Sequence, residues 1–444
     1  MNRSHRVGLP AVAAVAAAAL ALSACGSSGG SSGSGSKSTA LTASAPGITA
    51  TTITVGSHQP LTGVAAPGYD EIAPASNAYF DYVNAHGGVY GRKIVYKYLN
   101  DQYNPTDTVS VVKQLVLQDN VYAIFNGLGT PTHLAVAPFL NSEKVPDVFV
   151  ASGCECWNNP TQWPETFGWQ LDYVREGKIL GSYIKQHFAG QKIGYFYQDD
   201  EFGKDGVKGL DMEIPAADVV SRQSYDPTNI NVGPQVAALK AAGAKVVVSF
   251  SVPAFTALLK LNSLKLGFSP TYVVSDVGAD PITLAGLLEA YAKQGGATVS
   301  GNALTQGIIT DGYLPTLGDT GNSWIALFKK IHDTYIPKLP FDGNVLYGEA
   351  VAYTFVQAML KAGRNPTRED LVKAIQGGLA QGAAVAPYAY SASVHSGMTG
   401  AYIGIIKNGV IVQEGPVLTT TTAATSPVST YTGSAPAAPA SGMP

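Results

Sequence analysis

Charged side chains are scarce in this sequence, and this narrows the classes of partner that it can have. Lys, Arg, Asp and Glu make up 13% of the 444 residues, against about 25% in a typical globular chain. The formal net charge is −3, and the Lys and Arg residues are not clustered. A nucleic-acid-binding protein needs a basic surface to contact phosphates. We therefore expect no nucleic-acid partner.

Grouped metal ligands and nucleotide-binding motifs are also missing. The seven histidines form no H-x-x-x-H pair and no group with cysteine, which are the patterns of a built metal site. The sequence contains neither a Walker motif nor a complete G-x-G-x-x-G. A nucleophile, a base and an orienting residue cannot be assembled from its motifs either. We expect no metal, no cofactor and no enzymatic activity.

Glycine and proline are too few for a disordered chain. They number 49 and 27, about 17% together, below the roughly 25–30% that marks disorder. No repeat of about 20 to 50 residues is present, which argues against a solenoid or a propeller. Because the length is about three times that of a typical domain, we expect at least two packed cores.

The N-terminal residues have the layout of a secretory signal. Arg3, His5 and Arg6 precede an apolar run over 7–22, which is too short to span a membrane comfortably. The run ends in Leu22-Ser23-Ala24-Cys25, which resembles the lipobox of bacterial lipoproteins. That resemblance implies cleavage before Cys25 and attachment of a diacylglycerol to its sulfur. The alternative is an ordinary signal peptide or membrane anchor with an incidental cysteine.

Both ends of the chain have the composition of segments without a core. Residues 26–36 contain only Gly and Ser, so we expect 25–50 to be a flexible tether behind the lipidated cysteine. Residues 418–444 are rich in Thr, Ala, Ser and Pro and have no charged side chain. We expect a disordered tail there. The mature protein is then a folded body fastened to the outer face of the cytoplasmic membrane by lipid.

The body alternates short β-branched runs with longer stretches of helical period, which predicts an α/β fold with doubly wound parallel sheets. A first set of strands is followed by a second set with the same pattern, so two lobes are expected. The Asn408-Gly409 pair between two β runs predicts a type I′ hairpin. The expected strands are 53–56, 93–98, 121–125, 147–150, 192–197, 219–222, 245–249, 271–274, 402–407 and 410–413.

Ligands of open α/β sheets bind at the carboxyl ends of the strands, so the residues that follow each strand are the candidate site. Three such loops are rich in small and hydroxyl residues: 57–63, 126–132 and 151–154. Gly129 and Thr130 would let a carboxylate approach backbone N–H groups and a hydroxyl, although glycine and threonine also serve turns and caps. Asp276, after a strand of the second lobe, would suit an ammonium group.

Other polar and aromatic residues of these loops have two readings. Asp199, Asp200 and Glu201 fit solvated charges at a helix start better than a site. The aromatic residues between Gly153 and Tyr173 either line a pocket or form a satellite core, and Tyr173 stands where the chain leaves the first lobe. Cys154 and Cys156 could form a local disulfide, which we favour, or remain as thiols or a metal site.

Several motifs resemble those of a known family. They are Ile53-Thr54-Val55-Gly56, Pro60-Leu61-Thr62-Gly63, the stretch VNAHGGVYGRKI over 83–94, and the segment from Asn100-Asp101 to Pro105. Over residues 50–415 or so, the chain looks like the branched-chain amino-acid (Leu/Ile/Val) binding proteins of ABC importers. The resemblance implies a type I periplasmic-binding fold with three crossings between lobes. It also implies closure on a small ligand and delivery of that ligand to a permease and ATPase complex, and we expect a monomer.

The resemblance assigns roles to single positions. It implies that Thr130 binds a ligand carboxylate, that Ser152 and Gly153 provide a second contact, that Phe202 is an aromatic from the second lobe, and that Asp276 faces the ligand amine. Many relatives have Tyr at the position of Phe202, Ala-Thr at 152–153 and Glu at 276. The ligand could therefore be a branched-chain amino acid or another small carboxylate, amide or aromatic compound.

With this fold, the expected lobes are 51–171 with 307–398, and 172–306 with 399–417. A second function fits the same fold: a ligand-sensing lipoprotein that signals to a membrane partner. Two-component genes beside the coding sequence would favour sensing, whereas permease and ATPase genes would favour transport.

Overall fold

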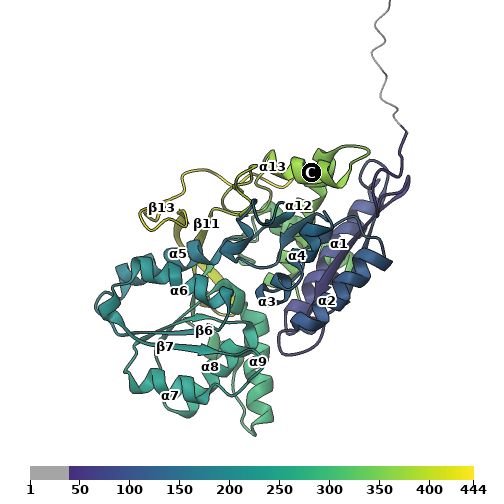
Figure 1. Cartoon of the computed structure of the whole chain (residues 1–444). Helices are drawn as coiled ribbons and strands as arrows, with labels where there is room; N and C mark the ends of the chain where they lie inside the picture. The colour runs from purple at the N-terminus through teal and green to yellow at the C-terminus, as the bar shows by residue number, and fades with distance from the viewer. Residues whose placement is uncertain (1–39) are drawn as a thin grey trace, which may run out of the picture. The chain divides into compact units, whose positions relative to one another are not determined.

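The computed structural model describes residues 40–444 (Figure 1). The expected signal peptide over 1–24 and Cys25 lie outside the described residues. Within the described range, no helix combines the length and apolar composition needed to cross a membrane. Two sheets, each with helices packed against it, organise this part of the chain.

The first sheet has five parallel strands in the order β2-β1-β3-β4-β5. Its longest pairing joins β1 to β2, with Thr52 opposite Lys93 and Gln59 opposite Asn100. Strands β3 and β4 are buried along their whole length, as parallel strands covered on both faces should be. The strands are β1 (Thr52–Gln59), β2 (Lys93–Asn100), β3 (Ile124–Phe125), β4 (Asp147–Val150) and β5 (Thr166–Gly168).

The helices of this lobe follow their sequence signals closely. Asn104 caps α2, where its side chain accepts from the N–H groups of Thr106 and Asp107, and Pro105 is the first helical residue, as the sequence predicts. The elements are η1 (Tyr69–Glu71), α1 (Ile72–Ala85), α2 (Pro105–Lys113), the π-helical η2 (Gln114–Gln118), α3 (Thr130–Leu134), α4 (Ala137–Ser142) and η3 (Glu155–Trp157).

The second sheet has eight strands in the order β13-β12-β11-β10-β9-β8-β6-β7. Strands β7, β6, β8, β9 and β10 are parallel, and β11, β12 and β13 extend the sheet by antiparallel pairing. The strands are β6 (Ile193–Gln198), β7 (Val219–Tyr225), β8 (Val246–Phe250), β9 (Thr271–Val274), β10 (Ile309–Gly312), β11 (Gly400–Lys407), β12 (Val410–Thr419) and β13 (Ser429–Thr430).

Helices cover both faces of this sheet, with α5 and α6 on one side of β6 and β7 and α7 and α8 on the other (Figure 1). The elements are α5 (Tyr173–His187), α6 (Glu201–Glu213), η4 (Ala216–Asp218), α7 (Gly233–Ala241), α8 (Pro253–Lys265), η5 (Asp276–Gly278), α9 (Pro281–Gln294) and α10 (Gly301–Thr305). The link between β11 and β12 has positive φ at Asn408 (53°) and Gly409 (78°), which confirms the predicted type I′ turn.

After β10 the chain returns to the first lobe. It forms α11 (Ser323–Tyr335), α12 (Gly343–Ala362) and α13 (Arg368–Gln376), and α12 packs along α1. The Ser76 hydroxyl donates to the Gly348 carbonyl at 2.8 Å in this contact. Because β10 pairs with β9 and β11, the crossing follows Gly312, a few residues later than the expected boundary at 306/307.

The two ends of the described chain differ from the sequence expectation. Within the expected tether, Ile48 is buried and the Ser44 hydroxyl donates to the Pro366 carbonyl at 2.8 Å. The expected disordered tail is instead packed against both lobes. The buried Lys178 of α5 donates to carbonyl groups of the tail. The Tyr79 hydroxyl of α1 donates to the Gly442 carbonyl at 2.8 Å. Low side-chain hydrophobicity did not prevent this, because backbone carbonyls make many of the contacts, while Val428, Ala438 and Met443 pack against the core.

Candidate functional site

A cavity of about 260 Å³ lies where the strand exits of the two sheets meet. Aromatic and aliphatic side chains form most of its wall, and none of the described residues that line it is Lys, Arg or His. Five of the seven residues predicted to bind a ligand line it: Gly129, Thr130, Tyr173, Phe202 and Asp276. Ser152 and Gly153 do not, and lie just behind the wall.

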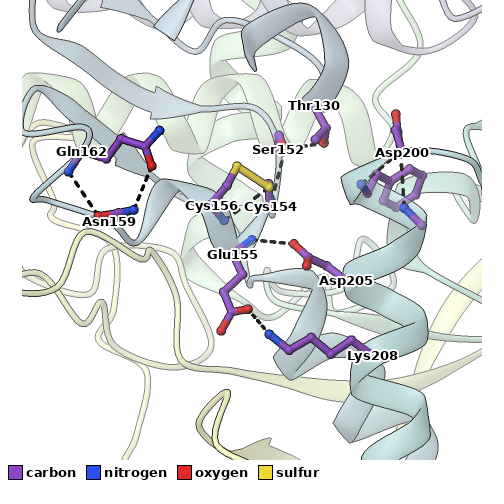
Figure 2. Close-up of a disulfide and its surroundings, with 12 residues drawn as sticks. Thr130, Ser152, Cys154, Glu155, Cys156, Asn159, Gln162, Asp200, Asp205 and Lys208 are labelled. Carbon is purple, nitrogen blue, oxygen red and sulfur yellow. Dashed lines mark hydrogen bonds and ion pairs between the residues drawn. A yellow bond between two sulfur atoms is a disulfide. The ribbon is translucent and has the colours of Figure 1, made fainter. Parts of the chain in front are cut away.

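Ser152 lies behind Thr130, and the two side chains form a hydrogen bond. The two hydroxyl oxygens are 2.7 Å apart and both residues are buried (Figure 2). The mutual hydrogen bond uses one of the two O–H groups of the pair, and the Ser152 side chain also interacts with the Tyr173 hydroxyl. Gly129, which directly precedes Thr130, has a φ of 102°, a conformation that glycine adopts without strain. A Cβ there would also be only 2.4 Å from the Thr132 hydroxyl.

Gly153 positions Tyr173 instead of lining the cavity. The Tyr173 N–H donates to the Gly153 carbonyl at 2.7 Å. A Cβ on Gly153 would lie 2.5 Å from the Leu171 carbonyl oxygen and 2.9 Å from the Tyr173 ring. The absence of a side chain therefore lets the first turn of α5 approach the loop after β4.

The aromatic part of the site lies in the second lobe, at the starts of α5 and α6. The Tyr173 and Phe202 rings are 4.6 Å apart between centroids, a distance typical of stabilising aromatic pairs. Asp200 fixes the start of α6, since its carboxylate accepts from the N–H groups of Phe202 (3.0 Å) and Gly203 (3.4 Å). This confirms the helix-start interpretation for Asp200, while the side chain of Asp199 is 58% exposed.

Asp276 has two acidic neighbours that the sequence analysis missed. Carboxyl oxygens of Glu176 on α5, Asp276 on η5 and Asp311 on β10 all lie within 4.8 Å of one another. Asp311 also lines the cavity. The strand-exit rule could have found Asp311 had β10 been predicted, whereas no spacing signal points to Glu176, which lies inside a helix.

Burial raises the pKa values of all three carboxyl groups. Desolvation raises the pKa values of Glu176 and Asp276 well above their usual range, and the charge of Asp311 raises them further. Desolvation also raises the pKa of Asp311 to about 7. The cluster therefore holds protons near neutral pH, and a cation would have to displace them to bind.

Most of the aromatic stretch between Gly153 and Tyr173 is core. Trp157 is buried with Ala137, Val150 and Cys154 in a small separate cluster, while Phe167 and Trp169 belong to the main core. This confirms the satellite-core interpretation for Trp157, and Tyr173 is the one aromatic residue of the stretch that lines the cavity.

Cys154 and Cys156 form the favoured local disulfide (Figure 2). Glu155 between them faces α6 of the other lobe: its N–H donates to the Asp205 carboxylate at 2.8 Å, and its side chain pairs with Lys208. Desolvation raises the pKa of Asp205 to about 6. The disulfide loop is therefore a contact between the lobes, outside the residues that line the cavity.

Two α/β lobes with a shared cavity at their strand exits define a ligand-binding protein of the type I periplasmic-binding fold. The chain belongs to the periplasmic binding protein family, whose sequence profile matches residues 52–410.

Curated relatives are more distant. Leu/Ile/Val-binding protein homolog 7 of Brucella abortus (strain 2308) is 26% identical over 236 residues, which cover 51% of this chain and 59% of the relative. The chain thus spans about three fifths of that relative. Homolog 8 of Brucella suis biovar 1 (strain 1330) is 22% identical over 76% of this chain and 83% of its own length.

Solved structures share the fold at low identity. A branched-chain amino acid ABC transporter protein from Thermus thermophilus with bound valine has a TM-score of 0.70 at 20% identity, covering 84% of this chain and 97% of that one. A fatty acid ABC transporter substrate-binding protein from Thermomonospora curvata has a TM-score of 0.69 at 22% identity, covering 83% and 93%. Such likeness establishes the fold alone.

Proposed function

We propose that this protein is a lipid-anchored extracellular solute-binding protein. It captures a small polar ligand between its lobes without altering it and hands it to an ABC permease. The observation that carries the proposal is the cavity, to which both lobes contribute: Thr130 from the first, and Phe202 and Asp276 from the second. A ligand that touches both lobes favours the closed arrangement by the amount that it binds that arrangement better.

The residues have separate roles in this proposal. Thr130 and the backbone of Gly129 receive an anionic or carbonyl group, supported by Ser152 and Gly153 from behind. Tyr173 and Phe202 pack against the body of the ligand, and Asp276 receives a cationic group. A few charge-assisted hydrogen bonds at about 1.5–3 kcal/mol each, less the cost of ordering, are compatible with the roughly −8 kcal/mol of a micromolar complex.

The relatives favour an amino-acid ligand. The curated relatives are named as Leu/Ile/Val-binding proteins, and one structural neighbour is described with bound valine and another with isoleucine. The cavity volume of about 260 Å³ lies just below the roughly 300–1,000 Å³ of pockets for drug-sized ligands, which supports a ligand as small as an amino acid. We propose a branched-chain amino acid or a related carboxylate, amide or aromatic compound.

The anchor has its own test. Lipid on Cys25 requires cleavage before that residue, so mass spectrometry of the mature N-terminal peptide from the native host should find a diacylglyceryl cysteine. Cys25→Ala should release the protein from the membrane fraction or leave its signal peptide uncut. A soluble, correctly cut wild-type protein would contradict the anchor and leave ligand capture standing.

Capture is tested by a thermal-shift screen of the purified full-length protein, followed by calorimetry of the hits. The panel contains branched-chain and aromatic amino acids, short-chain acids, amides and amines. We expect at least one ligand to bind with micromolar affinity and to be recovered unchanged by mass spectrometry. Chemical turnover of a hit would contradict the proposal, as would failure of every compound to bind.

Delivery is tested in cells of the native host. Deleting the gene should abolish uptake of the labelled ligand, and the wild-type gene should restore it. Unchanged uptake together with a loss of ligand-dependent gene expression would replace transport by the sensing function.

A further inference from the structure

Glu176, Asp276 and Asp311 come from three separate elements and converge at one end of the cavity. Their carboxyl oxygens lie within 4.8 Å of one another, and Glu176 and Asp311 are each only 1% exposed. Asp276 and Asp311 belong to the cavity wall. Buried carboxyl groups are costly unless they find donors or counter-charges, so this convergence calls for a partner.

The protein supplies hydrogen-bond donors for only some of these carboxyl oxygens. The backbone N–H of Asp276 donates to Glu176 Oε1 and Asp311 Oδ1, at 3.2 Å each. Three of the other four carboxyl oxygens, Glu176 Oε2, Asp276 Oδ1 and Asp311 Oδ2, are buried and have no hydrogen-bond partner among residues 40–444. A buried acceptor without a donor costs about 1–3 kcal/mol. Three of them beside one cavity therefore point to a ligand that brings several donors.

Among residues 40–444, no cationic side chain acts on the pKa values of the cluster. The titratable groups that face it are phenols, from η1, α5, the segment after β10, α12 and β11: Tyr69, Tyr173, Tyr313, Tyr347 and Tyr402. Asp280, also in the cavity wall, adds another acid. The positive charge must come from the ligand, and the apolar walls favour a ligand with an apolar body.

We propose that Glu176, Asp276 and Asp311 together form a subsite for the primary ammonium group of an amine with a short apolar body. The inference rests on the proposed function and adds two residues to the acid expected at position 276. A tetrahedral –NH₃⁺ group donates three hydrogen bonds, and acceptors about 2.8 Å from its nitrogen lie about 4.6 Å apart. The spread of the three carboxyl groups accommodates this arrangement. The amino group, more than the carboxylate, is then what the protein requires of a ligand.

Three probes with the same carbon skeleton test this requirement on the full-length protein by calorimetry. L-leucine carries both groups, 3-methylbutan-1-amine lacks the carboxylate, and 4-methylpentanoic acid lacks the amine. We expect the amine to keep measurable binding and the acid to bind at least about 100-fold more weakly than leucine. Shorter and longer n-alkylamines extend the series should the leucine skeleton not fit.

Isosteric variants connect the effect to the two added residues. Glu176→Gln and Asp311→Asn keep the shape and remove the charge, so amine affinity should fall about 10- to 100-fold in each. Asp199→Asn, on an exposed side chain of the same lobe, should leave the affinity unchanged. Circular dichroism and thermal melts verify that the variants fold.

Several outcomes overturn the inference. They are equal binding of the acid and of leucine, unchanged amine affinity in both variants, or no binding by any amine up to about 10 mM, the concentration scale of very weak complexes. Tight Ca²⁺ or Mn²⁺ binding that Asp311→Asn abolishes would make the cluster a metal site instead. In each of these cases, acids or amides that still bind leave the proposed function standing, whereas failure of every compound class removes both.

Discussion

The Nε2 atom of His58 lies 2.9 Å from the Nδ1 atom of His133, and both rings are fully buried. Their outer nitrogens bond to carboxylates, His58 Nδ1 to Asp101 at 2.7 Å and His133 Nε2 to Asp147 at 2.8 Å. The four side chains therefore form one buried hydrogen-bonded row, Asp101–His58–His133–Asp147, and burial lowers the pKa of His58. A Cβ on Gly127 would lie 2.5 Å from His58 Nε2. The row of hydrogen-bonded side chains therefore lies directly behind the loop that contains Thr130.

Replacing one residue of this hydrogen-bonded row should destabilise the protein strongly. His133→Ala leaves His58 Nε2 without its partner and removes the imidazole hydrogen-bonded to the buried Asp147, and each buried polar group left unsatisfied costs about 1–3 kcal/mol. Urea denaturation of the variant and the wild type measures the loss. His187→Ala, at an exposed position, is the matched control and should change the free energy of unfolding by less than about 0.5 kcal/mol. Equal values for the two variants would mean that the buried row contributes nothing.

The acid cluster should make the ligand-free protein less stable as the pH rises. Burial raises the pKa of Asp311 to about 7, so the folded state holds a proton that the unfolded chain releases near pH 4. The stability due to this proton is complete below pH 4 and is lost as the pH rises through 7. Asp311→Asn should therefore raise the free energy of unfolding at pH 8 relative to the wild type, on the order of 2 kcal/mol. Urea midpoints between pH 4 and 8 test this, and a difference independent of pH would contradict it.

Affinity for an amine should follow the opposite trend. An ammonium group requires ionised carboxylates, and the raised pKa values of Glu176, Asp276 and Asp311 keep protons on the cluster at low pH. Binding of 3-methylbutan-1-amine should strengthen at least about tenfold from pH 5.5 to 8 and release protons to solvent. Calorimetry in phosphate and in Tris at one pH counts the released protons, since the two buffers differ in ionisation enthalpy. A flat profile with no proton release would mean that the cluster is already ionised.

Gly153→Ala should weaken ligand binding without touching the ligand. The new methyl group would lie 2.9 Å from the Tyr173 ring and 2.5 Å from the Leu171 carbonyl oxygen, so Tyr173 must move from its place in the cavity wall. We expect about a tenfold loss of affinity, measured by calorimetry, because small displacements of positioning residues are costly. Gly286→Ala is the control, since a Cβ there has nothing within 4 Å. Unchanged affinity in Gly153→Ala would show that the loop absorbs the methyl group.

The C-terminal tail should contribute to stability through Lys178. Its ammonium donates to the carbonyls of Thr421, Ala423 and Ser426 at 2.9, 2.7 and 2.6 Å. Lys178→Met should cost about 2–4 kcal/mol of unfolding free energy, since hydrogen bonds to charged groups contribute most. Lys185→Met on the same helix, with a side chain 57% exposed, should cost little.

Truncation after Thr419 tests whether Lys178 stabilises the protein through its contacts with the tail or in some other way. Removing 420–444 should destabilise the wild type, and the loss should be smaller in the Lys178→Met background, because the two changes remove the same contacts. Strictly additive losses would mean that Lys178 acts independently of the tail.

Local residue patterns by themselves determined much of this protein. Apolar β-branched runs, the Asn104 cap and the Asn408-Gly409 turn indicated the strands, one helix start and the hairpin, because these signals act between neighbours in the chain. Strand ends in an α/β sheet converge, so the sequence alone predicts Thr130 and Asp276 at one site.

Tertiary structure alone decided which distant groups meet. Glu176 lies inside a helix and Asp311 on a strand, and only the packing of α5 against the second sheet brings them to Asp276. The tail has little apolar surface to bury, yet its backbone carbonyls find Lys178 and Tyr79, since peptide groups bond irrespective of side-chain composition. Such contacts depend on three-dimensional proximity between segments far apart in the chain, and no local pattern of residues encodes that proximity.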